Sequence, residues 1–443
     1  MMSVRALKPR DFYLNKLIAF KDTEPVKVVT GIRRCGKSSL LKLMIAWLKE
    51  QGISDDAIVE MNFESFAYKD MSADDVYAYV KERISKTGIT YLFFDEIQRV
   101  PGWEEVINAF RVDFNCDIYV TGSNAYLLSS EYATYLSGRS VEIKMLPLSF
   151  KEFIEFNSLE LREITTPLGT REKRVYDDNG QVYLLSDIFN LYLRFGGMPG
   201  IADVGFDQDR AMTLLDGIYN TVVVRDILER EQRRNQRQVT DSDLLQKIVR
   251  FLADNVGSNI SASSIGNTLV NEGLLDAGKR SGGRNGTPSA HTVQAYIATL
   301  LEAYFFYEIK RFDIKGREFL RTLGKYYIVD IGLRNYLLGF RDRDTGHVLE
   351  NVVYLELLRR GYDVAIGKID RFEVDFIATK ADEKLYIQVT ESMRDEMVRE
   401  RELRPLQKIQ DNYKKLVLIL EPGIEREFGG IQVVNVVDWL IEI

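Results

Sequence analysis

The stretch from Val26 to Leu41 constrains the fold of this chain more than any other. It reads V-K-V-V-T-G-I-R-R-C-G-K-S-S-L-L. Apolar β-forming residues lead into Gly31, a short loop follows, and Gly36, Lys37 and Ser38 open an amphipathic run. The predicted order is therefore strand, glycine-bounded loop and helix. This is the context in which G-x-x-x-x-G-K-[ST] forms a phosphate-binding loop.

The chemistry of such a loop follows from its backbone. Its N–H groups converge on an anion at a helix N-terminus, where the helix dipole is positive. Glycine permits the curled backbone. We expect Lys37 to reach the phosphates and the Ser38 hydroxyl to bind Mg²⁺. The alternative is a Gly-Lys-Ser turn before an ordinary helix, which the flanking elements disfavour. The expected phosphate-binding residues are Gly31, Ile32, Arg33, Arg34, Cys35, Gly36, Lys37, Ser38 and Ser39.

Two acids follow the next strongly apolar strand, which runs from Thr90 to Phe94 and ends in Asp95 and Glu96. In a parallel α/β sheet, the carboxyl ends of the strands lie beside the ligand. We therefore expect Asp95 to hold Mg²⁺ through water and Glu96 to polarise an attacking water as general base. The alternative is a pair of acids that end a strand at a surface turn.

A later strand at 117–120 is followed by Thr-Gly-Ser-Asn. A small polar group there, Asn124 or Ser123, is predicted to contact the γ-phosphate or the attacking water. The alternative is a plain turn, because these residues favour turns. A further strand at 141–145 follows Arg139. Strands that alternate with helices predict a parallel sheet with crossover connections.

These stretches, together with P-L-S-F-K-E-F at Pro147 to Phe153, resemble AAA+-type P-loop ATPases over residues 10–205. The resemblance is strongest to the prokaryotic branch akin to the signal-transduction NTPases. It implies an AAA-like α/β domain with a helical lid. It also implies ATP rather than GTP, because the chain shows no guanine-reading N-K-x-D element.

The resemblance also implies roles for single residues. Asp95 and Glu96 match the Walker B pair, Ser38 and Asp95 are the expected Mg²⁺ ligands, and Arg139 is a candidate trans-acting or nucleotide-sensing arginine. A surface ion pair is the alternative for Arg139. The expected catalytic residues are Glu96, Lys37, Asn124 and Arg139.

Three residues inside the loop are harder to assign. Arg33 and Arg34 add cations near the phosphate, although one of them could be solvated without a role. The helix N-terminus favours a thiolate at Cys35, but a small residue tolerated in the loop is the preferred explanation.

Residues 151–238 are expected to form a helical lid and junction. Residues 151–195 are predicted as mixed helical, with a loop at 165–180. The Gly196-Gly197-Met-Pro sequence marks a sharp bend, and the resemblance places it in the lid over the nucleotide. A plain hinge is the alternative. A helix is predicted at 211–231.

Residues 239–345 predict three helices and a β-hairpin, which resembles a winged helix-turn-helix. The recognition helix at 289–304 would offer Ser289, His291, Thr292 and Gln294 to a groove of double-stranded DNA. The flexible basic loop at 279–287 suits phosphate contacts. Residues 230–345 hold 18 Lys and Arg against 13 Asp and Glu. The recognition helix itself lacks Lys and Arg, so packing or protein contact is the favoured alternative.

Residues 346–443 resemble the PD-(D/E)xK nuclease fold. Glu350, expected to open a helix, and Asp375 match its first two acids, and Gln388 stands at the third position. Thr390 replaces the lysine that would stabilise developing charge. We therefore expect an inactive small α/β domain used for binding or assembly, with a metal-dependent nuclease as the weaker alternative. The terminal segment 433–443 is expected to return to the sheet.

Composition fits a cytoplasmic ATPase. The chain has 443 residues, a formal net charge of −7 and two cysteines, which suits a reducing compartment. It contains no membrane-spanning apolar run and no secretory signal. The predicted domains are 1–150, 151–238, 239–345 and 346–443. We expect a Mg²⁺-dependent ATPase that repositions its C-terminal modules. A DNA-binding regulator that uses ATP as a switch is the alternative, and a protein partner or homo-oligomer is compatible with either.

Overall fold

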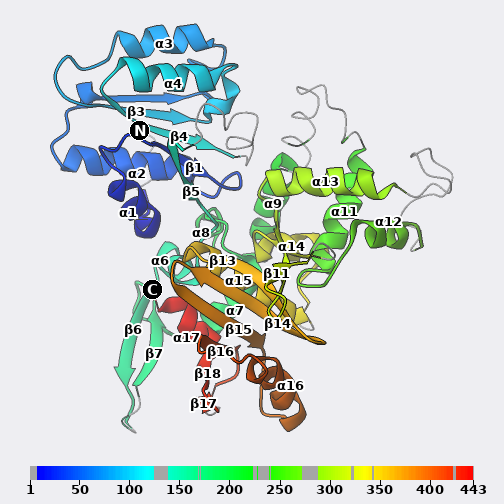
Figure 1. The fold of residues 1–443 in the computed structure, drawn as a ribbon. Coiled ribbons are helices and arrows are strands. Elements are labelled where there is room, and N and C mark those ends of the chain that lie inside the picture. Colours follow the sequence, from blue (N-terminus) through cyan, green and yellow to red (C-terminus); the bar gives the residue numbers. More distant parts are fainter. Residues whose placement is uncertain are drawn as a thin grey trace. The chain divides into compact units, whose positions relative to one another are not determined.

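The chain forms two compact units, seen in Figure 1. Unit 1 comprises Met1–Leu146 and Glu302–Tyr304, and unit 2 comprises Pro147–Leu301 and Phe305–Ile443. The domain boundaries predicted at 150, 238 and 345 stay predictions. The structure, a computed structural model, describes residues 7–123, 138–167, 169, 171–222, 227, 239, 241–271, 288–320, 324–341, 344–422 and 426–442.

Unit 1 is a parallel sheet with helices on both faces. Its elements are α1 (Asp11–Ala19), β1 (Val26–Thr30), α2 (Lys37–Glu50), η1 (Asp55–Ala57), β2 (Ile58–Asn62), α3 (Ala73–Lys81), β3 (Thr90–Asp95), η2 (Ile97–Arg99), α4 (Trp103–Asp113), β4 (Cys116–Gly122) and β5 (Ser140–Lys144). The strand order is β2-β3-β4-β1-β5, and each neighbouring pair is parallel. The predicted parallel sheet is confirmed. Its carboxyl ends therefore lie along one edge, where the loop after β1 and the acids of β3 meet.

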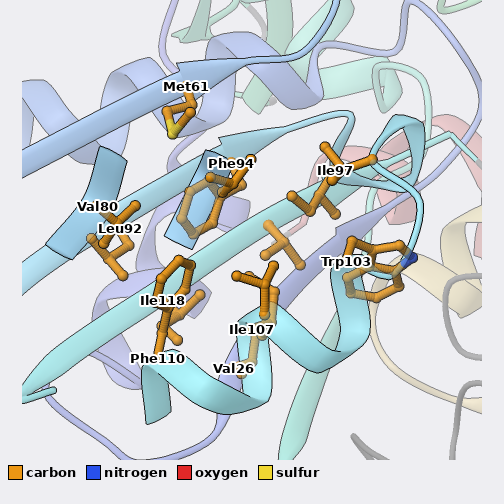
Figure 2. Close-up of a cluster of buried hydrophobic side chains, with 14 of the residues drawn as sticks. Val26, Met61, Val80, Leu92, Phe94, Ile97, Trp103, Ile107, Phe110 and Ile118 are labelled. Atoms are coloured by element: carbon orange, nitrogen blue, oxygen red, sulfur yellow. The ribbon is translucent and has the colours of Figure 1, made fainter. Parts of the chain in front are cut away.

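The core of unit 1 explains why α3 and α4 cover one face of this sheet. Apolar side chains of β1, β2, β3 and β4 pack against both helices, and Figure 2 shows Phe94, Phe110 and Ile107 within this cluster. Phe94 and Phe110 are stacked with ring centroids 5.7 Å apart. Burial of such aromatic side chains stabilises the sheet that positions the loop.

Unit 2 combines helices with an eight-stranded sheet, a three-stranded sheet and a two-stranded sheet. Its first elements are α6 (Phe150–Phe156), β6 (Glu160–Thr165), β7 (Arg171–Tyr176), β8 (Val182–Leu184), α7 (Leu185–Phe195), α8 (Ile201–Val204), α9 (Gln208–Tyr219), α11 (Ser242–Asp254), α12 (Ala262–Asn271), α13 (Ala290–Glu302), β9 (Phe306–Ile309), β10 (Arg311–Asp313), β11 (Glu318–Phe319) and β12 (Lys325–Ile328). The helices α11, α12 and α13 precede the antiparallel pair β9 and β12, which is the element order that the winged-helix prediction requires. The winged-helix assignment itself stays a prediction.

The second part of unit 2 completes an eight-stranded sheet. Its elements are α14 (Ile331–Leu338), α15 (Thr345–Arg359), β13 (Asp363–Ile369), β14 (Phe372–Lys380), β15 (Glu383–Thr390), α16 (Glu396–Gln407), β16 (Lys414–Ile419), β17 (Glu427–Phe428), β18 (Ile431–Asn435) and α17 (Val436–Ile441). The sheet order is β11-β10-β13-β14-β15-β16-β18-β17. β13, β14 and β15 are antiparallel neighbours, whereas β16 is parallel to β15.

The structure corrects three predictions in unit 2. Residues 160–184 form the three-stranded antiparallel sheet β6-β7-β8, where a loop at 165–180 was expected. The charged side chains of β6 and β7 hid this pattern, because Val175 is the one residue of these two described strands that is buried. Glu350 does not open its helix, because α15 begins at Thr345. The end of the chain returns to the sheet only through β18, and α17 follows.

The Gly-Gly-Met-Pro element binds a carboxylate of its own chain. The Gly197 N–H donates to Asp330 Oδ2 at 2.6 Å, and the backbone N–H groups of Met198, Gly332 and Leu333 also hydrogen-bond to Asp330. A Cβ at Gly196 would lie 2.3 Å from Asp330 Oδ1, so this position excludes side chains. Burial raises the pKa of Asp330 to about 6. These contacts explain both glycines without a nucleotide, and the lid role stays a prediction.

None of the described helices combines the length and the apolar character that crossing a lipid bilayer requires.

Replacing Asp330 by Ala should lower the free energy of unfolding by about 3 kcal/mol or more, because buried N–H groups lose a charged acceptor. Asp241 offers a matched control, since it also caps a helix but is exposed. We expect Asp241→Ala to cost about 1 kcal/mol. Urea unfolding followed by circular dichroism measures both values, and equal losses would contradict the assignment.

Candidate nucleotide-binding site

The loop after β1 is shaped by the end of β5. Gly31 has a φ of +144°, and a Cβ there would lie 2.1 Å from the carbonyl oxygen of Met145. The Met145 N–H in turn donates to the Thr30 carbonyl at 2.7 Å. Gly36 has a φ of +107° at the start of α2. Only glycine readily adopts these backbone angles. The loop therefore requires glycine at both positions of the sequence pattern.

The ammonium group of Lys37 lies inside the loop. Its Nζ donates to the carbonyl of Gly31 at 3.0 Å and to that of Ile32 at 3.2 Å. Lys37 is only 4% exposed, and Ile32 is fully buried. The cation is therefore held where the loop curls, with neutral carbonyl groups as its partners.

Two residues outside the sequence pattern, Arg10 and Tyr13, hydrogen-bond to the backbone of the loop and of the segment after β5. Arg10 donates to the carbonyl of Cys35 at 3.1 Å and to that of Leu146 at 3.0 Å. The Leu146 N–H donates to the Tyr13 hydroxyl at 3.1 Å. Arg10 is 3% exposed. We did not predict either contact, because the sequence separation between Arg10 and Leu146 leaves no local signal.

Asp95 is held by two polar side chains at the carboxyl ends of neighbouring strands and by a hydroxyl of α2. Its Oδ1 accepts from Thr121 Oγ1 at 2.5 Å, and its Oδ2 accepts from Asn62 Nδ2 at 2.9 Å. The Ser38 hydroxyl also hydrogen-bonds to Asp95. Burial raises the pKa of Asp95, and the hydrogen bonds from Thr121 and Ser38 oppose that rise. The two expected metal ligands, Ser38 and Asp95, are thus brought together.

Glu96 turns away from the strand in a left-handed conformation, with a φ of +56°. Its N–H donates to Thr121 Oγ1 at 2.9 Å. Its carboxylate accepts from Ser123 Oγ at 3.1 and 3.0 Å and from Gln98 Nε2. Ser123 is therefore beside Glu96, as its expected role requires. Asn124 lies outside the described residues.

The two arginines of the loop and Ser39 differ in exposure. Arg33 forms an ion pair with Glu64 at 2.6 Å, and Arg99 pairs with the same oxygen at 2.8 Å. Arg34 and Ser39 are exposed, and Arg34 has a φ of +64°. Glu64 thus connects the loop to the segment after the acidic pair.

Cys35 faces the interior. Its side chain is fully buried, and its Sγ lies 3.5 Å from the Met145 carbonyl oxygen. This placement agrees with a small residue that fits beneath the loop.

Arg139 lies at the opposite end of the strands. Its carbonyl accepts from the Val26 N–H at 2.9 Å, and Val26 is paired with Ser140. The loop follows the other end of β1, which at about 3.3 Å per residue is about 16 Å away. Arg139 is exposed. Its trans-acting and nucleotide-sensing roles both stay predictions.

The parallel five-stranded sheet, the glycine loop and the acids of β3 define unit 1 as an AAA-type P-loop domain. A family model described as "AAA domain" matches residues 23–154. A second model, described as "Domain of unknown function (DUF8612)", matches residues 186–344. The comparison thus supports a P-loop ATPase in the first part of the chain.

Two uncharacterized proteins are similar to this chain over most of its length. A Haemophilus influenzae protein bearing only the name "Uncharacterized protein" is 40% identical over 99% of this chain and 100% of its own length. The chain belongs to the same family as this protein. An uncharacterized protein of Methanocaldococcus jannaschii is 29% identical over 90% of this chain and 83% of its own. The solved structure of a Walker-type ATPase of Pyrococcus abyssi is 18% identical, covers 74% of this chain and 95% of that chain, and has a TM-score of 0.44.

Replacing Thr121 by Val should lower the affinity for Mg·ATP about 10- to 100-fold, because the hydroxyl orients both Asp95 and Glu96. Thr299→Val is the matched control, since Thr299 is also buried but donates only within its own helix, to the Ala295 carbonyl. Calorimetric titration measures both affinities. Equal affinities in the two variants would show that Thr121 does not position the site.

Proposed function

We propose that the protein binds ATP with Mg²⁺ at the loop of residues 31–39 and hydrolyses it. The observation that carries this proposal is the meeting of Lys37, Ser38, Asp95 and Glu96 at one edge of the parallel sheet. The start of α2 provides backbone N–H groups and a positive dipole for an anion. ATP rather than GTP is inferred from the resemblance.

The residues beside the loop fit a magnesium ion. The Ser38 hydroxyl and the Asp95 carboxylate offer oxygen ligands, which Mg²⁺ prefers. Two protein ligands are enough, because Mg²⁺ usually completes its coordination with phosphate oxygens and water. Ser38 and Asp95 would hold the ion, which would neutralise phosphate charge. Thr121 and Asn62 fix the orientation of Asp95.

Lys37 and Glu96 supply the remaining chemistry. The Lys37 ammonium would exchange two neutral carbonyl partners for phosphate oxygens, with which it forms stronger charge-assisted bonds. Glu96 would accept a hydrogen bond from the attacking water and orient it in line with the γ-phosphate. Ser123, which already donates to Glu96, would keep that carboxylate in place.

We further propose that ATP turnover repositions the C-terminal modules. Residues 302–304 belong to unit 1, although Glu302 is the last residue of α13 and the rest of that helix belongs to unit 2. The Tyr304 hydroxyl donates to Glu142 Oε1 at 3.2 Å, and the same oxygen accepts from Thr30 Oγ1 at 2.6 Å. Thr30 precedes Gly31 of the loop. This connection gives the loop a path to α13.

Replacing Glu96 by Gln should leave ATP binding intact and lower turnover about 10²- to 10⁴-fold, because the amide cannot act as a base. Lys37→Ala should abolish binding. The exposed residues Glu105 and Lys42 provide matched controls, and Glu105→Gln and Lys42→Ala should behave as wild type. Phosphate release and nucleotide titration measure these effects. Normal turnover by Glu96→Gln would disprove the base assignment.

DNA binding is a second proposal, favoured by the positive charge of residues 230–345 and by the element order of α11, α12, α13, β9 and β12. On α13 the side chains of His291 and Gln294 are exposed, whereas Ser289 caps the helix. The basic loop at 279–287 lies outside the described residues. A partner protein or a second copy of the chain could use the same face.

If this region binds DNA, duplex affinity should fall steeply with salt and fall further when Lys279, Arg280 and Arg284 are changed to Ala. Fluorescence anisotropy with labelled duplex measures the effect, and Lys8→Ala in unit 1 serves as a charge control. Binding that is insensitive to salt or to the triple change would contradict DNA binding by this region and favour a protein partner.

A further inference from the structure

The three residues that the resemblance matches to nuclease positions lie near one another in unit 2. Glu350 lies on α15, Asp375 on β14 and Gln388 on β15. The Asp375 N–H donates to Gln388 Oε1 at 2.8 Å. Thr390, at the position of the usual lysine, is buried and carries no charge. A nuclease of this fold would hold a divalent metal ion here.

A lysine from a different strand lies among these acids. Lys325, on β12, places its Nζ 2.8 Å from Glu373 Oε1 and 3.5 Å from Glu350 Oε2. Its residue is 4% exposed. Although burial alone favours the neutral amine, the carboxylates of Glu350, Asp375 and Glu373 raise the pKa of Lys325 above its ordinary value. A permanent cation thus lies among the acids.

Several polar atoms of this cluster are already hydrogen-bonded within the protein. Gln388 Oε1 accepts from the Asp375 N–H, and Gln388 Nε2 donates to Glu402 Oε2 at 2.9 Å. Asp375 Oδ2 accepts from the Val389 N–H at 2.8 Å. Burial and the neighbouring Glu350 carboxylate raise the pKa of Asp375. These hydrogen bonds occupy the Gln388 amide oxygen and one of the two Asp375 carboxylate oxygens, so fewer oxygens remain for a divalent ion.

The carboxylates of Glu350 and Glu373 also accept hydrogen bonds. Glu350 Oε2 accepts from the Tyr327 hydroxyl at 3.1 Å, and Glu373 Oε2 accepts from Asn259 Nδ2 at 3.0 Å. Among the residues that the structure describes, no three His, Cys, Asp or Glu side chains are grouped as a metal site requires. A divalent ion placed here would also be repelled by the nearby ammonium group.

We propose that Lys325 is the resident cation of this cluster and that Glu350, Glu373 and Asp375 therefore bind no divalent metal ion. The acids serve instead to fasten β12 and the α11–α12 connection to β14, through Lys325 and Asn259. This assignment excludes metal-dependent cleavage by the C-terminal region. It does not depend on the ATP site.

The test measures Mn²⁺ binding to the nucleotide-free full chain by electron paramagnetic resonance. Wild type and Asp375→Asn should bind the same amount of Mn²⁺, because this cluster takes none. Lys325→Met should gain a Mn²⁺ site that Lys325→Met/Asp375→Asn lacks. Lys415→Met is the matched control, since Lys415, on β16, donates to the backbone carbonyl of Ile409, and it should gain no site.

Two results would overturn the proposal. One is Mn²⁺ binding, or Mn²⁺-dependent plasmid cleavage, by wild type that is lost in Asp375→Asn. This result would make Lys325 a partner of the metal rather than its substitute. The other is a folded Lys325→Met protein without the new site. If Lys325→Met does not fold, Lys325→Met/Glu373→Gln removes one charge of each sign and takes its place in the same comparison.

Discussion

The close approach of Gly31 to the Met145 carbonyl is the contact on which the nucleotide site depends. No side chain fits between these two backbone segments, so the loop must curl where β5 ends. Arg10 then ties the back of the loop to Leu146. The surrounding chain therefore shapes the loop before any ligand arrives. A preorganised site loses little free energy in ordering when it binds.

The sequence alone predicted most of unit 1, because its signals are local. Alternation of apolar strands and helices gave the parallel sheet, and the spacing of Gly31, Gly36 and Lys37 gave the loop. Asp95 and Glu96 follow their strand directly, so their place at the carboxyl edge followed from the sheet alone. Arg139, offered by the resemblance as a trans-acting or nucleotide-sensing arginine, pairs through its carbonyl with the Val26 N–H at the start of β1, and both roles stay predictions.

The contacts that sequence analysis missed join residues far apart in the chain. Thr121 was passed over in favour of its neighbours, although its hydroxyl bridges both acids. In unit 2, two sequence patterns that are typical of ligand sites instead contact charged residues of the same chain. The Gly-Gly-Met-Pro bend encloses Asp330, and the carboxylates of Glu350 and Glu373 contact Lys325. Buried charges of this kind need a partner, and only the fold shows which residue supplies it.

The central claim is that the curled backbone and the ammonium of Lys37 capture a polyphosphate beside Asp95 and Glu96. Titration calorimetry of the full chain with Mg·ATP tests this claim most directly. We predict saturable heat from one site per chain, displaced by Mg·ADP. An absence of heat from folded protein, or the same heat from a chain lacking the Lys37 side chain, would contradict it.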